Sequence, residues 1–287
     1  MTIRNPVEWG VDQFRHAAVA VETAGRAGRR TRDNLRSPAP AIRCVAVRDL
    51  RAILARGLAD FSAFRTDVIF LCVIYPVVGL VLARLAFGYD LLPLIFPLAS
   101  GFALIGPFAG VGLYEMSRRR EAGADVTWAD TVKVVRSPSF GAIVLLGLLL
   151  MAIFLLWLLA AEAIYQMTLG PAPPVSIGSF IRDVFATSPG WTMIGVGCGV
   201  GFLFAVLAFG ISVVSFPLLL DREAGVDTAI LTSIRAVIAN PAAMAVWGLI
   251  VAGGLVIGSI PFFLGLIVVM PVLGHSTWHL YRAVVER

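Results

Sequence analysis

Six long apolar runs follow one another along this chain, and each is about as long as a helix that crosses a lipid bilayer. A bilayer core about 30 Å thick needs roughly 20 apolar residues in helical form. Backbone groups in lipid must pair within their own segment, which favours helices over open strands. The sequence therefore predicts an all-α membrane protein with about six transmembrane helices. The predicted spans are residues 68–87, 91–116, 140–165, 191–220, 242–260 and 262–280.

The connections between these runs predict three helical hairpins. Pro261 offers a tight turn between the last two runs. Residues 166–189 contain a proline-rich turn followed by a short amphipathic stretch at 177–186. Before each hairpin, apolar residues recur at helical spacing among arginines, as in residues 47–65. We therefore expect a cytoplasmic amphipathic helix, lying in the membrane interface, before each hairpin.

A short repeat in the loops supports this division of the chain. The sequence Arg-Glu-Ala-Gly occurs at residues 120–123 and again at 222–225, and each copy is followed by an amphipathic stretch and then a proline. Proline at the start of a helix loses no hydrogen bond, so it suits the beginning of a span. The predicted organisation is a basic, partly disordered cytoplasmic tail at 1–45 and a transmembrane domain at 46–287. Its three units are about 46–122, 123–222 and 223–287.

The distribution of charged residues indicates how the chain is oriented in the membrane. The chain is 59% hydrophobic and only 14% charged, so its charge is too sparse to cover a water-exposed surface. Of its 23 Lys and Arg residues, all but Arg84 and Arg182 fall on one side of the predicted spans. Basic residues accumulate on the cytoplasmic side, so both termini are expected in the cytoplasm of a bacterial inner-membrane protein. The basic excess is explained by this topology, and nucleic-acid binding is not expected.

The pair His275 and His279 is the first candidate site. The two residues are four apart, so a helix places them on one face, where two imidazoles can bind a metal or haem edge. No cysteine or carboxylate lies nearby in the sequence to complete such a site. The neighbouring Trp278, Tyr281 and Arg282 are typical of a membrane–water boundary. Interfacial anchoring is therefore the favoured interpretation, with ligand binding as the alternative, and neither a metal nor a cofactor is predicted.

Glu115 is the second candidate, at the inner end of the second predicted span. A carboxylate within a span is a functional hypothesis by default. Arg118 and Arg119 follow three and four residues later, within reach on a helix. We therefore expect an ion pair at the membrane edge. The alternative is that Glu115 anchors the adjoining interfacial helix.

Glycines at four-residue steps recur in three of the predicted spans. Small residues at this spacing let membrane helices approach closely. They predict helix packing, with a crevice for a lipid or a solute as the alternative. The glycines are Gly106, Gly110, Gly195, Gly199, Gly254 and Gly258.

Several motifs in the second and last runs form a recognisable set. They are Phe96-Pro97-Leu98, Leu104-Ile105-Gly106-Pro107-Phe108-Ala109, Gly112-Leu113-Tyr114-Glu115, Ser117-Arg118-Arg119 and Gly274-His275-Ser276-Thr277-Trp278-His279-Leu280-Tyr281-Arg282. The set resembles a bacterial family of predicted integral-membrane proteins, domain of unknown function 2189, over about residues 45–285. The resemblance implies the membrane architecture and carries no assigned activity.

No arrangement of catalytic residues can be assembled from the sequence. The leading hypothesis is a non-enzymatic scaffold, assembly factor or lipid-interacting component of the inner membrane. Its expected partners are membrane lipids, with a membrane-protein partner or a second copy of the chain. The alternative is a transporter or channel for a small or amphipathic solute, since proline falls inside the second span of every predicted hairpin. A mid-membrane charge, which an ion-coupled carrier usually needs, is absent from the spans as drawn.

Overall fold

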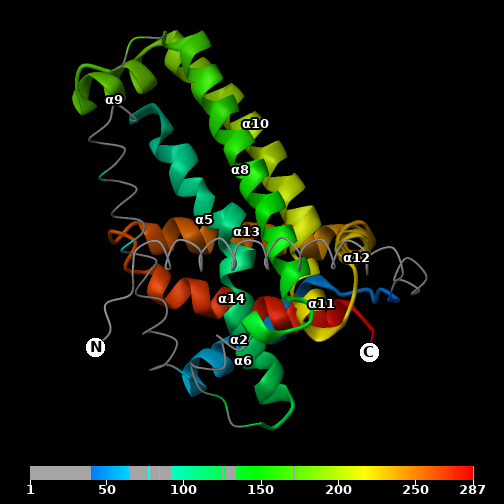
Figure 1. The fold of residues 1–287 in the computed structure, drawn as a ribbon. Coiled ribbons are helices and arrows are strands. Elements are labelled where there is room, and N and C mark those ends of the chain that lie inside the picture. Colours follow the sequence, from blue (N-terminus) through cyan, green and yellow to red (C-terminus); the bar gives the residue numbers. More distant parts are fainter. Residues whose placement is uncertain are drawn as a thin grey trace, which may run out of the picture.

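The computed structural model describes residues 40–64, 77, 84, 92–124, 126, 134–170, 172 and 174–286, and over these residues it is helical with no strand (Figure 1). The longer helices are α2 (Leu50–Ala63), α5 (Ile95–Ala109), α6 (Val111–Glu121), α8 (Phe140–Thr168), α9 (Ile177–Ala186), α10 (Ser188–Ser212), α11 (Ser215–Asp221), α12 (Val226–Ala239), α13 (Pro241–Ser259) and α14 (Leu266–Val284). Three short 3-10 turns are η1 (Val47–Asp49), η2 (Leu92–Leu94) and η3 (Val134–Arg136). Apart from two single positions, the predicted first span lies outside the described residues, as does most of the predicted tail.

Four stretches of the described residues are long and apolar enough to cross a membrane: Ile95–Glu121, Phe140–Thr168, Ser188–Asp221 and Pro241–Ser259. They coincide, within a few residues at most ends, with the second to fifth predicted spans. The sixth predicted span is helical as α14 but does not join this group. Its second half carries histidine, serine and threonine, which lower its hydropathy.

Helices α8 and α10 are long neighbours, and α9 connects them at one end of the pair (Figure 1). Helices α13 and α14 pack against each other and run across the direction of α8 and α10 (Figure 1). Spans of one bundle are usually tilted by only about 20° from the bilayer normal. The described helices therefore differ from the parallel set of hairpins that the sequence predicts.

Two of the candidate spans are interrupted, one near its middle and one near its end. Gly110 separates α5 from α6, and Pro107 precedes the break. Between α10 and α11 the break falls at residues 213–214, where the backbone N–H of Val214 donates to Ser233 Oγ at 3.2 Å. Two of the three proline-containing spans are thus interrupted, whereas Pro271 lies inside the continuous helix α14. At the second break a neighbouring side chain binds the freed backbone group.

Helix α2 buries its apolar face against α14. Leu50, Ile53 and Phe61 are buried. At Gly57, an added Cβ would come within 1.9 Å of Ser276 Oγ and 2.7 Å of its backbone nitrogen. The face that the sequence predicts to meet the membrane interface therefore contacts another helix, because periodicity identifies an apolar face without identifying its partner.

The segment at residues 42–45 holds both ends of the α13–α14 hairpin, and we call it the clasp. Asn240, just before α13, accepts a hydrogen bond from Val45 N at 2.6 Å and donates to the carbonyl of Arg43 at 3.1 Å. Beyond α14, Val285 forms an isolated bridge with Ile42. Two distant parts of the sequence are thus fixed to one extended segment.

The repeated Arg-Glu-Ala-Gly motif does not repeat its conformation. Gly123 lies two residues after the end of α6 and has a φ of +71°, a left-handed conformation that favours glycine. Gly225 has a φ of −72° and instead precedes the first residue of α12. The internal repeat therefore stays a prediction from the sequence.

Candidate functional site

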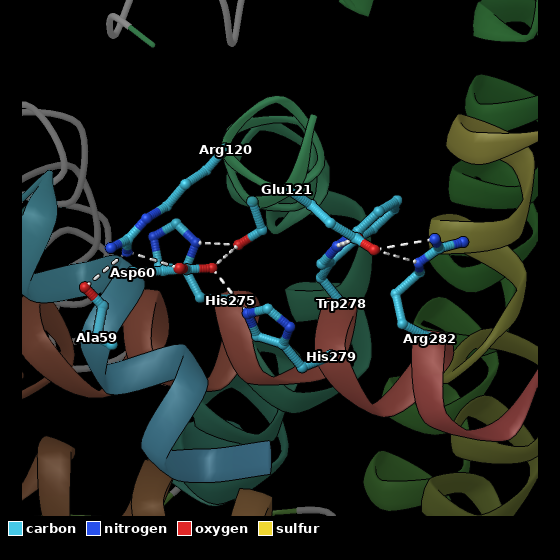
Figure 2. A network of polar contacts seen from close by, with 9 residues as sticks. Ala59, Asp60, Arg120, Glu121, His275, Trp278, His279 and Arg282 are labelled. Atoms are coloured by element: carbon cyan, nitrogen blue, oxygen red, sulfur yellow. Dashed lines mark hydrogen bonds and ion pairs between the residues drawn. The ribbon is translucent and has the colours of Figure 1, made fainter. Parts of the chain in front are cut away.

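A set of polar side chains with a buried centre joins α2, α6 and α14, and we call it the Asp60 network (Figure 2). It consists of Asp60, Ser117, Arg120, His275 and His279. The Asp60 carboxylate accepts hydrogen bonds from Ser117 Oγ at 2.6 Å, Arg120 Nη1 at 2.7 Å and His279 Nε2 at 2.8 Å. One carboxylate therefore connects three helices that are far apart in the sequence.

Ser117 determines the hydrogen-bonding state of His275. Its hydroxyl has a single proton, which it donates to Asp60. The 2.8 Å contact between Ser117 Oγ and His275 Nδ1 must then use the proton of the imidazole. His275 Nε2 is left as a buried acceptor without a hydrogen-bond partner among the described residues. This tautomer follows from the donors and acceptors around the ring.

The Asp60 network is closed to solvent at its centre. The exposed fractions are 5% for Asp60, 1% for Ser117 and 0% for His275. Burial disfavours a charged carboxylate, but hydrogen bonds from His279 and Ser117 outweigh it, so the pKa of Asp60 lies below its ordinary value of 3.8. The carboxylate is therefore held in its charged form by groups from the other two helices.

A second network surrounds Arg282, near the end of α14. Arg282 bridges Glu121 at 2.9 Å and Asp221 at 3.3 Å. Trp278 Nε1 donates to Glu121 at 3.1 Å, and Tyr281 donates its hydroxyl proton to Asp221 at 2.7 Å. Burial and the bond to Asp221 raise the pKa of Tyr281 above its ordinary value of 10.0. This Arg282 network ties α14 to the ends of α6 and α11.

Glu115 lies with the two arginines that the sequence indicates. It accepts hydrogen bonds from Arg118 Nε at 2.7 Å and Nη2 at 2.9 Å, and from Arg119 Nε at 2.6 Å. The carboxylate is buried, whereas the two guanidinium groups are partly exposed. All three residues belong to α6, so these bonds stabilise the helix itself.

The histidines lie on one face of α14 but have different partners. His275 points to Ser117 and His279 to Asp60 (Figure 2). Among the described residues, no group of three or more His, Cys, Asp or Glu side chains is arranged to hold a metal ion. Trp278, Tyr281 and Arg282, predicted as interfacial anchors, all take part in contacts with other helices.

The predicted packing glycines divide into two groups. An added Cβ on Gly258 would come within 2.8 Å of Leu266, and one on Gly254 within 3.2 Å of Val269. On Gly110 it would meet Tyr114 at 2.8 Å, whereas on Gly106 its nearest contact, Met270, would lie at an ordinary 3.7 Å. Around Gly195 and Gly199 the structure leaves open space. A packing role for the last two stays a prediction.

Sequence reasoning missed the central residue of the site. Asp60 lies on the apolar face of α2, between Gly57 and Phe61, and this misplaced charge was the signal available. A carboxylate on an apolar helix face needs a partner when that face is buried. Which partner it finds depends on contacts across more than fifty residues of sequence, which periodicity does not encode.

Comparison with known proteins identifies one family. Residues 95–221 match the family described as predicted integral membrane protein (DUF2189). The resemblance in the sequence motifs is thereby confirmed for this range, which covers less than half of the chain. The last group of motifs, around His275, lies beyond it. No curated protein and no solved structure matches the chain. The chain is thus an integral membrane protein with several candidate spans and no assigned activity.

Proposed function

We propose that the protein is a non-enzymatic structural component of the bacterial inner membrane, which organises lipids or a membrane-protein partner. The observation that carries the proposal is the burial of the centre of the Asp60 network. Asp60 binds donors from two other helices, and its exposed fraction is only 5%. A catalytic group must reach a substrate. Buried side chains that bind one another instead fix the relative positions of their helices.

The outward apolar surface supports the same proposal. On α8, Leu148, Leu155 and Leu159 are exposed, and on α10, Phe202 and Leu203 are exposed. Apolar patches of this kind on candidate spans are suited to lipid chains or to the span of another protein. We therefore place the contact surface of the protein on these helices and its rigid junction at the Asp60 network.

The proposed topology places both termini in the cytoplasm. Its support is the distribution of arginine along the sequence. The sequence further predicts six spans and interfacial helices. Helix α12 supports the interfacial part, because it buries Thr232 and Ser233 while exposing Leu231 and Ile238. An exposed apolar face beside Arg235 is typical of a helix that lies in the membrane interface.

The proposal is tested by extracting the full chain in native lipid discs. Native mass spectrometry then identifies bound lipid, and cross-linking before extraction identifies proteins. We expect a reproducible lipid or protein partner that survives purification. Variants Leu155→Ser and Phe202→Ser should weaken its retention, while the exposed Ser62→Ala, on α2, serves as a control. Preparations that repeatedly contain neither a specific lipid nor a partner would contradict the proposal.

Transport of a small or amphipathic solute is the second candidate. The broken helices favour it, because discontinuous spans are a common feature of transporter binding sites. The test is a cysteine at Ser212, next to the α10–α11 break, in a chain whose native cysteines are replaced. A solute path predicts that small water-soluble thiol reagents modify this position. Protection of Ser212→Cys in the folded protein would argue against such a path.

A further inference from the structure

The α13–α14 hairpin has an apolar tip that no described segment covers. Between Arg235 and Arg282 the chain contains no Asp, Glu, Lys or Arg. At the tip, Ile260 is 75% exposed and Phe262 is 77% exposed, and Leu264 is exposed as well. Turns that face water are usually built from Gly, Asn, Asp, Ser and Pro. The composition of this tip is suited to hydrocarbon.

Both ends of the hairpin are held at one place. The clasp binds Asn240 before α13, and it also pairs with the chain beyond α14, where Arg43 N donates to the Val284 carbonyl at 2.7 Å. A segment of four residues cannot lie on both sides of a membrane. The hairpin therefore starts and ends on the same side, which is the cytoplasmic side under the proposed function.

The return arm is short. From Leu266 to Gly274, α14 is apolar, and nine helical residues extend about 14 Å. The next residue, His275, already belongs to the Asp60 network, which involves Ser117 and Arg120 close to the end of α6. A bilayer core is about 30 Å thick, so this arm covers about half of it. Helices α13 and α14 also run across the direction of α8 and α10 (Figure 1), so beside membrane-crossing α8 and α10 the hairpin lies oblique to the bilayer and reaches less deeply than its length.

The turn forms most of its own backbone hydrogen bonds. The N–H groups of Phe262, Phe263 and Leu264 donate to carbonyls at residues 260, 259 and 261, over 2.9–3.1 Å. Ser259 Oγ donates to the Leu255 carbonyl at 2.8 Å. Irregular backbone enters hydrocarbon only when its polar groups are paired. Residues 262–264 therefore have no need of water for these N–H groups.

We infer that residues 241–274 form a re-entrant hairpin that enters the bilayer from the cytoplasmic side, buries the turn at 260–265 among lipid acyl chains and returns without crossing. The inference rests on the topology in the proposed function. In place of the predicted spans at 242–260 and 262–280, the chain then has one hairpin inserted in the inner leaflet. The hairpin can then brace α6, since Gly274 contacts Leu113 of α6 so closely that a Cβ on the glycine would come within 2.6 Å of it.

The test uses single cysteines in the full chain, with Cys44, Cys72 and Cys198 replaced by serine. Phe262→Cys and Ile260→Cys report on the tip, and both side chains are highly exposed, so the fold should persist. Ala186→Cys, at an exposed position of α9, is the outer control, and Arg51→Cys, at an exposed position of α2, is the inner control. Intact and permeabilised cells are treated with a membrane-impermeant maleimide. Purified protein in lipid discs carries a nitroxide at the same sites, and its accessibility to oxygen and to a nickel chelate is measured.

We expect no maleimide labelling at residues 260 and 262 from either side of the membrane. Nitroxides at these residues should be accessible to oxygen, and their accessibility to the nickel chelate should be at least fivefold lower than at Arg51→Cys. Labelling of the tip from outside would mean that the hairpin crosses, and labelling only after permeabilisation would place it in cytoplasmic water. Protection from both oxygen and nickel would mean that protein covers the tip. Each of these three results overturns the inference. Failure of Ala186→Cys to label from outside would instead refute the topology on which it rests.

Discussion

At Asp60, one carboxylate accepts hydrogen bonds from three side chains of two other helices. The contribution of Ser117 to the Asp60 network can be tested most directly, because Ser117→Ala removes one hydroxyl group and changes no charge. The variant deprives Asp60 of a donor and removes the side-chain acceptor of His275 Nδ1. A buried polar group without a partner costs about 1–3 kcal/mol. We expect unfolding in mild detergent to become easier by that amount.

Ser62→Ala is the matched control for this prediction. Ser62 is exposed on α2, and its hydroxyl bonds the Leu58 carbonyl of the same helix at 2.8 Å. Exposed substitutions of this kind usually stay within about 0.5 kcal/mol of the parent. Equal stability of the Ser117→Ala and Ser62→Ala variants would show that the Asp60 network does not stabilise the fold.

The charge of Asp60 predicts how stability depends on pH. Its pKa in the folded chain lies below the ordinary 3.8, because bonds from His279 and Ser117 favour the charged form against the opposing effect of burial. The stabilisation is therefore complete above about pH 4 and is lost as the pH falls through the lower folded value. We expect the difference in thermal midpoint between the parent and Asp60→Asn to shrink on acidification from pH 6 to pH 3. If the difference in thermal midpoint instead grows as the pH falls, the charged form of Asp60 does not stabilise the folded chain.

Among the helices, the crossing of α2 over α14 depends on the absence of a side chain. A Cβ at Gly57 would approach the Ser276 backbone nitrogen to 2.7 Å, which is closer than real Cβ contacts allow. Gly57→Ala must therefore push the two helices apart, and overpacking of this kind costs about 1–3 kcal/mol. Thermal unfolding should show this loss.

The control for Gly57→Ala is Gly195→Ala, on α10. Nothing lies within 4 Å of a Cβ added at Gly195, and alanine favours a helix over glycine by up to about 1 kcal/mol. This second variant should be neutral or slightly more stable. If both substitutions change stability equally, the close contact between α2 and α14 is absent in the folded protein.

How far the sequence predicts this fold differs from element to element. The apolar run at residues 140–165 was enough to place α8, because the hydrocarbon thickness fixes the number of residues that a span needs. The run at 242–260 likewise located the helix α13, but its length alone does not say whether that helix crosses the membrane. The partner of α2 was not predictable, because its apolar face fits an interface or another helix equally well. Asp60 was hidden for the same reason, since its partners lie 57 to 219 residues away in the sequence.

Across the whole molecule, the clasp joins the beginning of the described chain to its end. Asn240 is buried and binds the backbone of both Val45 and Arg43. Asn240→Ala leaves these backbone groups without their partner and should cost about 1–3 kcal/mol. We expect trypsin to cut faster after Arg43 in this variant, measured by intact mass after limited digestion. Ser137 precedes Pro138 in the loop after α6, just as Asn240 precedes Pro241, so Ser137→Ala is the control and should not alter this rate.

The distribution of arginine predicts how the chain lies in the membrane. All but two of the 23 Lys and Arg residues fall on one side of the predicted spans, and that side includes both termini. Reporter fusions at residues 1 and 287 should therefore be active in the cytoplasm, whereas fusions within 166–188 should be active outside. A re-entrant hairpin and two crossing spans both leave an even number of crossings, so this pattern holds for either. A terminus outside the cell would refute the arginine argument itself, and with it the cytoplasmic placement of the Asp60 network.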